Sequence, residues 1–204
     1  MRKILLTFAL IMLVALTAGA QSFYFDIGLG SGFGKTSIEG IDVYNLYKLA
    51  GSNVKQISLD AGVRAGVGPF GNFPLYLVGD FNGMGHRIFS GSSYIQFNSF
   101  IAGGGIILYP LPVFQFGASF GYSFTLNMDS EPGEMPNGKG FGWTLSAAWD
   151  IGNNNHGLLL GIRYFYTVNR FEYDVNYPEF NNLELNSTML SLFLKYSFRN
   201  KVTR

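Results

Sequence analysis

The sequence contains no cysteine and little charge. None of its 204 residues is cysteine, and Asp, Glu, Lys and Arg together make up 13% of them. The first absence excludes disulfides and thiolate metal sites, and the second leaves about half the charged share of an ordinary soluble domain. The net charge of +1 gives no strongly basic surface of the kind that binds nucleic acid. The composition therefore disfavours a water-soluble, disulfide-stapled or nucleic-acid-binding protein.

Long apolar runs are missing from all but the start of the chain. Arg2 and Lys3 precede an apolar run that ends at Leu16, and small residues follow it up to Gln21. This run is shorter than the roughly 20 residues of a spanning helix, and its flanks are typical of a secretory signal. We expect residues 1–20 to be a cleaved signal peptide and residues 21–204 to form one domain.

Aromatic residues and glycines are abundant, with 20 Phe, 12 Tyr and 27 Gly. Between Phe114 and Leu126 every second residue is apolar and mostly bulky, and the residues between are small or polar. Successive side chains of a strand point to opposite faces, so this pattern predicts a strand with one apolar and one small polar face.

Seven further segments follow the same pattern, which gives eight expected strands in all. They cover residues 22–35, 55–68, 75–82, 93–109, 114–126, 141–151, 158–169 and 190–198. Within the fourth, Gly103, Gly104 and Gly105 blur the alternation and suggest a bulge. Short turns are expected at 69–74, 110–112 and 152–156, and long connections at 36–54, 84–92, 128–140 and 170–186.

These features predict an all-β fold, an eight-stranded antiparallel up-and-down transmembrane β-barrel. A sheet can cross hydrocarbon only when it closes on itself, because a free strand edge leaves its backbone groups without partners. Short turns at one rim and long loops at the other are typical of bacterial outer-membrane barrels with periplasmic termini. A soluble eight-stranded ligand carrier is the alternative, but its outer face would be rich in Lys and Glu.

The end of the chain resembles the C-terminal assembly signal of outer-membrane proteins. Tyr196 and Phe198 occupy the two aromatic places of that signal, although Phe193 stands where glycine is usual and six residues follow Phe198. As a whole, residues 21–204 resemble the small eight-stranded barrels typified by the transmembrane region of OmpA, by OmpX and by OmpW. The resemblance implies insertion by the barrel-assembly machinery into the outer membrane of a diderm bacterium. It also implies roles in envelope integrity, adhesion or immune evasion, or passage of small apolar molecules as in OmpW.

Charged side chains occur on the face that we expect to line the barrel. They are Asp26, Asp60, Arg64, Asp80, Arg163 and Lys195. The lumen of an eight-stranded barrel barely holds its own side chains, so buried charges of both signs must pair there. We expect a salt-bridged plug, and the alternative is a narrow, gated path for ions.

Three further hypotheses concern function. A narrow channel or lateral path for small apolar solutes would need an apolar lumen pocket near the outer rim, for which Phe100, Phe165 and Met189 are the candidates. His86, near Ser90 and Ser92 in an expected outer loop, would be the base of a lipid A-modifying enzyme. The last long loop is acidic and aromatic and could bind a cation or an extracellular ligand; its carboxylates are Glu172, Asp174, Glu179 and Glu184.

The preferred hypothesis is a non-enzymatic, monomeric barrel in contact with outer-membrane lipid, with a structural or surface-interaction role through four outer loops. No catalytic residue, cofactor or metal site is expected. The two histidines, His86 and His156, are too far apart in the sequence pattern to form a metal site.

Overall fold

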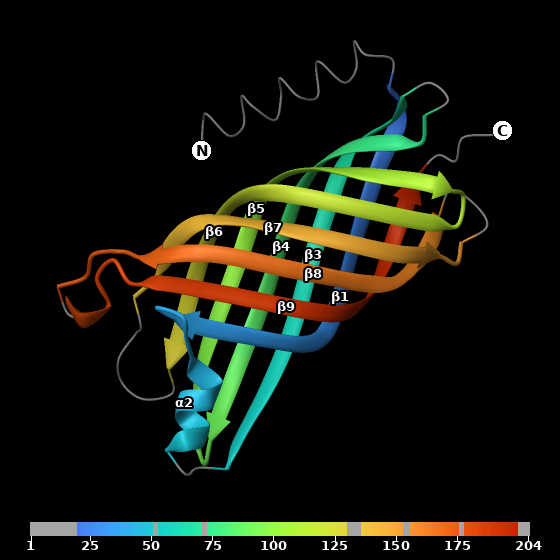
Figure 1. Cartoon of the computed structure of the whole chain (residues 1–204). Coiled ribbons are helices and arrows are strands. Elements are labelled where there is room, and N and C mark those ends of the chain that lie inside the picture. Colours follow the sequence, from blue (N-terminus) through green and yellow to red (C-terminus); the bar gives the residue numbers. More distant parts are fainter. Residues whose placement is uncertain are drawn as a thin grey trace.

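The computed structural model describes residues 20–50, 53–70, 73–129, 136–152, 156–175 and 178–199. Residues 1–19 of the predicted signal peptide lie outside these ranges, so the signal peptide stays a prediction. Within them the chain is almost entirely β-strand (Figure 1).

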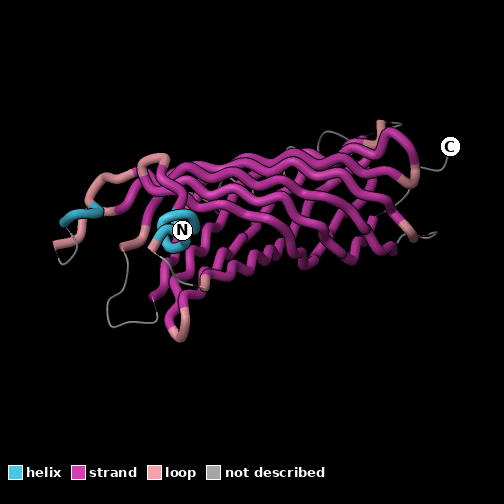
Figure 2. The backbone as a smooth tube through the Cα atoms, turned by 60° about the horizontal axis from the view of Figure 1, so that its bottom comes forward, coloured by secondary structure: helices cyan, strands magenta, loops and turns pink. Residues whose placement is uncertain are grey.

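Eight long strands form the described part of the molecule. They are β1 (Ala20–Ile38), β3 (Val54–Phe70), β4 (Leu75–Ser90), β5 (Ser93–Leu111), β6 (Phe114–Asp129), β7 (Gly138–Asp150), β8 (His156–Phe171) and β9 (Glu184–Arg199). The short elements are β2 (Ile41–Asp42), α2 (Val43–Leu49) and the 3₁₀ helix η1 (Pro178–Phe180). Both helices lie at the same end of the strands, which is the end with the longer connections (Figure 2).

The sheet closes on itself. Each long strand pairs antiparallel with the next along the chain, and β1 also pairs with β9, from Tyr24 opposite Arg199 to Ile38 opposite Leu185. The start of β1 and the end of β9 therefore lie at one end of the barrel, opposite α2 (Figure 1). The predicted eight-stranded antiparallel up-and-down barrel is confirmed.

The two faces of the barrel have opposite chemistry. Outward side chains are large and apolar, and Phe33 and Phe120 are 88% and 62% exposed. Inward side chains include Asp26 and Arg163, which are 0% and 1% exposed. This inversion of the usual soluble pattern excludes the soluble carrier and marks a barrel whose outer wall contacts lipid.

The connection predicted at 84–92 is wrong. β4 continues to Ser90, and Gly91 and Ser92 alone join it to β5; Gly91 adopts φ 64°, a left-handed conformation that glycine enters without strain. The prediction failed because the two faces exchange their chemistry in the outer half of β4, although the inward and outward positions still alternate. There Met84 and Ile88 point inward, whereas Arg87 points outward, so the segment looked polar and irregular.

The bulge predicted at Gly103–Gly105 is also wrong. These three glycines pair in unbroken register with Asp80, Gly79 and Val78 of β4. The irregularity in β5 lies nearer its end, between Leu108 and Leu111, beside Pro110. Proline has no backbone N–H to donate to the neighbouring strand, which explains the shift in pairing there.

The described residues include no helix that is long and apolar enough to cross a membrane. The seven-residue α2 begins after Asp42, whose side chain accepts a hydrogen bond from the backbone N–H of Asn45 and so caps the helix. Its Val43 is buried at the barrel mouth, and Leu49 is 85% exposed. α2 thus belongs to the outer loops and packs one side against the barrel end.

Candidate functional site

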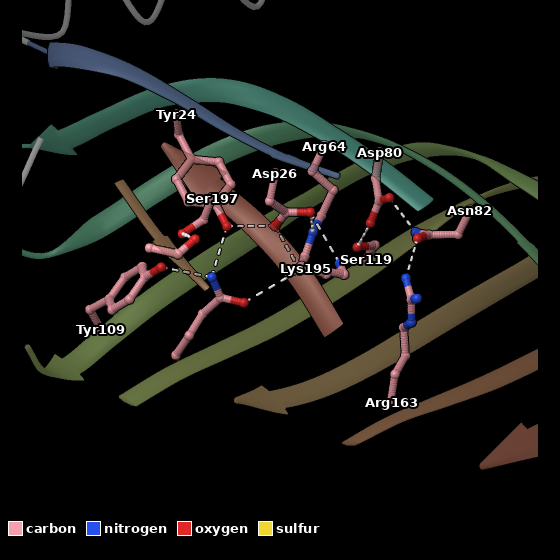
Figure 3. Close-up of polar contacts among 12 residues, drawn as sticks. Tyr24, Asp26, Arg64, Asp80, Asn82, Tyr109, Ser119, Arg163, Lys195 and Ser197 are labelled. Carbon is pink, nitrogen blue, oxygen red and sulfur yellow. Dashed lines mark hydrogen bonds and ion pairs between the residues drawn. The ribbon is translucent and has the colours of Figure 1, made fainter. Parts of the chain in front are cut away.

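The barrel interior contains all six charged residues singled out in the sequence. Each is at most 5% exposed, and they come from five different strands, β1, β3, β4, β8 and β9. The structure brings them into two adjoining groups, which we name the Asp26 cluster and the Asp60 cluster. Figure 3 shows five of the six residues, Asp26, Arg64, Asp80, Arg163 and Lys195.

The Asp26 cluster holds one carboxylate between two cations. Asp26 lies 2.9 Å from Nη2 of Arg64 and 3.1 Å from Nζ of Lys195. The hydroxyl of Tyr24 donates a third short hydrogen bond to Asp26, at 2.6 Å. Two cations against one carboxylate leave an excess of positive charge here, so the whole cluster depends on Asp26.

Gln115 extends the Asp26 cluster towards the periplasmic end. Its Nε2 donates to the hydroxyls of Tyr24 and Tyr109, both at 2.8 Å, and Arg64 donates to its Oε1 at 3.4 Å. These three neutral side chains were not among the residues predicted for the lumen network, which were all charged. Their inward positions in the alternation were the signal that could have identified them.

The Asp60 cluster lies beside it. Arg163 forms an ion pair with Asp60, and its Nη1 donates to Oδ1 of Asn82 at 2.6 Å. Asn82 in turn donates to Asp80, which also accepts from Ser119. Asp80 is therefore held by an amide and a hydroxyl, whereas the sequence predicted charge pairing throughout the lumen.

A further ion pair closes the periplasmic end. Arg199, the last residue of β9, lies 2.8 Å from Asp150 and donates to the backbone carbonyl of Pro112 at 2.6 Å. Its guanidinium carbon lies 3.6 Å from the centre of the Tyr109 ring, a close cation–π contact. This pair was not predicted, because the last strand was expected to end one residue earlier, at Phe198.

The opposite mouth is filled by apolar side chains, which we call the outer cap. The buried members of the outer cap are Val43, Ile88, Ile95, Phe97, Phe171 and Leu185. Side chains of α2 and of the last loop pack against them, among them Tyr47 and Phe180. Polar groups thus fill the middle of the lumen, and an apolar layer separates them from the outer side.

The structure does not place His86 in an outer loop, so that prediction is wrong. His86 points into the lumen from β4, is 0% exposed, and its Nδ1 lies 2.8 Å from the Ser58 hydroxyl. Ser90 ends β4, and Ser92 lies in the following turn. Gly34 gives the imidazole its room, since a Cβ at that position would lie 1.8 Å from Cε1 of His86.

Two of the three residues predicted to line an apolar pocket do point inward. Phe165 and Met189 are 1% exposed and pack with Met84 and Ile101 as a filled cluster. Phe100 is wrongly placed by the sequence, because it points outward and its ring lies 5.2 Å from that of Phe124. The expected bulge at the glycines of β5 would have turned Phe100 inward, but the register there is unbroken and Phe100 faces outward.

The last loop and the terminal aromatics complete the predicted residues. Glu172 pairs with Lys139, and no group of three metal-ligating side chains occurs in the described ranges. Tyr196 and Phe198 lie on the outward face of β9, where the Tyr196 hydroxyl is 2.6 Å from Nδ1 of His156. They belong to the aromatic girdle at the periplasmic end of the wall.

Comparisons with solved structures identify the same architecture. The chain is similar to Ail, the attachment invasion locus protein of Yersinia pestis, with a TM-score of 0.52 and 14% identity over 86% of this chain and 97% of that one. It is similar to Neisserial surface protein A, with a TM-score of 0.51 and 15% identity over 87% and 97% of the two chains. The outer-membrane protein AlkL gives 0.50 and 11% identity over 91% and 94%.

No protein-family model and no curated protein matches the chain. At such low identity the likeness shows the fold alone. That fold, together with the apolar outer wall and polar lumen, defines a small eight-stranded outer-membrane barrel.

Proposed function

We propose that this protein is a non-enzymatic outer-membrane barrel with a sealed lumen, whose role is to stabilise the envelope and to present its outer loops to the surroundings. The observation that carries the proposal is the filling of the lumen along its length. The Arg199–Asp150 pair, the two charge clusters and the outer cap follow one another from the periplasmic to the outer end.

Packing also argues against the two alternatives. An ion path needs mobile charges with water around them, but Arg64 and Lys195 are both bound to Asp26, and all three side chains are buried. A path for apolar solutes needs an empty apolar pocket, and the cluster of Phe165 and Met189 is filled. The position of His86 inside the lumen removes the main support for a lipid-modifying enzyme.

The outer loops favour a surface-interaction role. Leu49 of α2 and Tyr173 and Val175 of the last loop are 85%, 76% and 73% exposed at the outer end. Large apolar side chains left in water frequently mark contacts with a partner. Ail and Neisserial surface protein A carry attachment and surface roles in their names, which is consistent with this proposal.

Single-channel recording on the refolded protein in planar bilayers tests the sealed lumen. We expect no stepwise conductance from the wild type, and we expect Asp26→Asn to stay silent because the outer cap remains in place. Phe97→Ser with Leu185→Ser, which opens the outer cap, should produce conductance. Regular conductance steps from the wild type would contradict the proposal.

The loop role has its own test. Attachment of bacteria that produce the full chain should fall when Leu49→Ser and Tyr173→Ser are combined, and the matched control is Phe120→Leu on the lipid-facing wall. Equal attachment by all three strains would remove the surface role and leave the structural one.

A further inference from the structure

A groove runs along the outer wall where β3, β4 and β5 lie side by side. Ala61, Gly83 and Gly85 form its floor, because these small residues leave the sheet uncovered between larger neighbours, and Phe100 and Leu59 border it. Its volume of about 510 Å³ lies within the range of roughly 300–1,000 Å³ that is usual for small-molecule sites. A second groove shares Ala61, Gly83 and Phe100 and continues it along the wall.

Polar side chains border the outer end of this groove, on the face that elsewhere is apolar. Nε of Arg87 donates to Oε1 of Gln96 at 2.6 Å, and Nε2 of Gln96 donates to Oδ1 of Asn98 at 2.6 Å. Asn98 then donates to the backbone carbonyl of Leu126 at 2.8 Å. We call Arg87, Gln96 and Asn98 the polar ladder, and it holds the guanidinium of Arg87 at a fixed place.

The charge of Arg87 is not neutralised by a carboxylate within the described part of the chain. Its guanidinium carbon lies 4.7 Å from the centre of the Tyr94 ring, which orients the plane and leaves N–H groups for another partner. Lys55, also exposed, belongs to the neighbouring β3, where Ile57 pairs with Arg87. The outer end of the groove is therefore cationic.

The position of Arg87 along β4 corresponds to the headgroup region. A tilted strand rises about 2.5 Å per residue along the barrel axis, so the apolar band of roughly 25 Å takes about ten residues. β4 begins at Leu75 near the periplasmic rim, and Arg87 stands a little more than those ten residues further on. Arg87 thus lies at the outer surface of the hydrocarbon, and Ala61 and Phe100 lie below it.

We infer that this groove binds a phosphorylated, multiply acylated lipid of the outer leaflet, of the lipid A class. The phosphate would pair with Arg87, since guanidinium groups match phosphate oxygens bidentately. The headgroup hydroxyls would contact Gln96 and Asn98, and one acyl chain would lie over Ala61 and Gly83. The inference rests on the proposed outer-membrane barrel, but it requires neither the sealed lumen nor the loop role. A negative result in the conductance or attachment test therefore leaves it standing, and a negative result here leaves those two proposals standing.

Native mass spectrometry of the refolded full barrel in detergent micelles tests the inference. The probes are diphosphoryl lipid A, its dephosphorylated form and phosphatidylglycerol, each titrated separately. We expect diphosphoryl lipid A to bind at one site and dephosphorylated lipid A to bind at least tenfold more weakly. Phosphatidylglycerol binding as tightly as lipid A would overturn the assignment of the lipid class.

Matched variants assign the binding to this groove. Arg87→Gln should weaken lipid A binding about tenfold, whereas Arg170→Gln, an exposed arginine at the outer end of β8, should leave it unchanged. Ala61→Phe fills the floor with a side chain suited to lipid contact and should abolish binding while the barrel keeps its folded electrophoretic mobility. Equal losses from the two arginine variants would indicate general rim charge and overturn the inference. A mass corresponding to two protein chains that is lost in Ala61→Phe would also overturn the inference, because it would show that the groove binds a second copy of the chain.

Discussion

At the scale of single residues, Asp26 is the counter-charge on which the lumen depends. It pairs with Arg64 and Lys195 at once and accepts the Tyr24 hydroxyl. A buried ion pair contributes little net stability, because desolvation offsets the attraction, but removing one partner leaves a charge with nothing to compensate it. The cluster is therefore far more sensitive to loss of the shared anion than its net energy suggests.

Asp26→Ala should lower the free energy of unfolding by about 3–5 kcal/mol, the usual cost of breaking a buried pair. The measurement is urea unfolding of the barrel in lipid vesicles, followed by tryptophan fluorescence. Glu172→Ala is the control: Glu172 pairs with Lys139, both side chains are about half exposed, and such surface pairs contribute about 0–1 kcal/mol. Similar losses from both variants would show that Asp26 is not the shared partner of two cations.

At the scale of strands, the alternation decides which face meets lipid. β6 shows it without interruption, with Phe116 and Phe120 outward and Ser119 and Ser123 inward. The outward residues contribute nothing to a water-excluding core, so their apolar character is explained only by hydrocarbon outside. The residue types on the two faces of β6 are therefore set by lipid on the outside and by the polar lumen on the inside.

Phe120→Arg should destabilise the barrel in bilayers by about 2–4 kcal/mol, the cost of an arginine near the middle of the lipid-facing wall. Tyr173→Arg in the last loop should change stability by less than about 0.5 kcal/mol, because its side chain is 76% exposed to water. Unfolding in vesicles of both variants gives the comparison, and no loss for Phe120→Arg would mean that the faces are reversed.

Most of the fold could be predicted from the sequence, because a period of two is readable without knowing the partners of a strand. Near the outer end the lumen itself becomes apolar. The period of two remains there, but the apolar side chains, such as Met84 and Ile88, point inward instead of towards lipid. In the sequence that change resembles a loop, which is why His86 was predicted to lie in one. Alternation identifies the inward charges and also places Gln115 inward, but which inward side chains bind one another depends on strand register, which alternation alone does not fix.

At the scale of the whole molecule, the pairing of β1 with β9 closes the sheet into a barrel, and we call this pairing the seam. Ile27 lies opposite Tyr196 there, and both point to lipid. Directly opposed residues on antiparallel strands have Cβ atoms about 4.5–5.5 Å apart, close to disulfide geometry. Because the chain has no cysteine, an introduced pair reports on this seam without background.

Ile27→Cys combined with Tyr196→Cys should form a disulfide in the folded protein under mild oxidation. Ile27→Cys combined with Leu192→Cys, displaced by four residues along β9, should not. Non-reducing electrophoresis of membranes from cells that produce each variant measures the crosslink. Efficient bonding in the displaced pair would show that the register of closure is different.

The pairing of the first strand with the last also sets the order of events in assembly. Until β9 has arrived, β1 and the growing sheet each carry an open row of backbone donors and acceptors, which neither water-free lipid nor the strand's own side chains can satisfy. Insertion of a partly delivered chain into hydrocarbon would therefore leave two bare edges unsatisfied, so insertion is favourable only together with closure. In the completed ring these edges are paired with each other along the whole register from Tyr24 opposite Arg199 to Ile38 opposite Leu185.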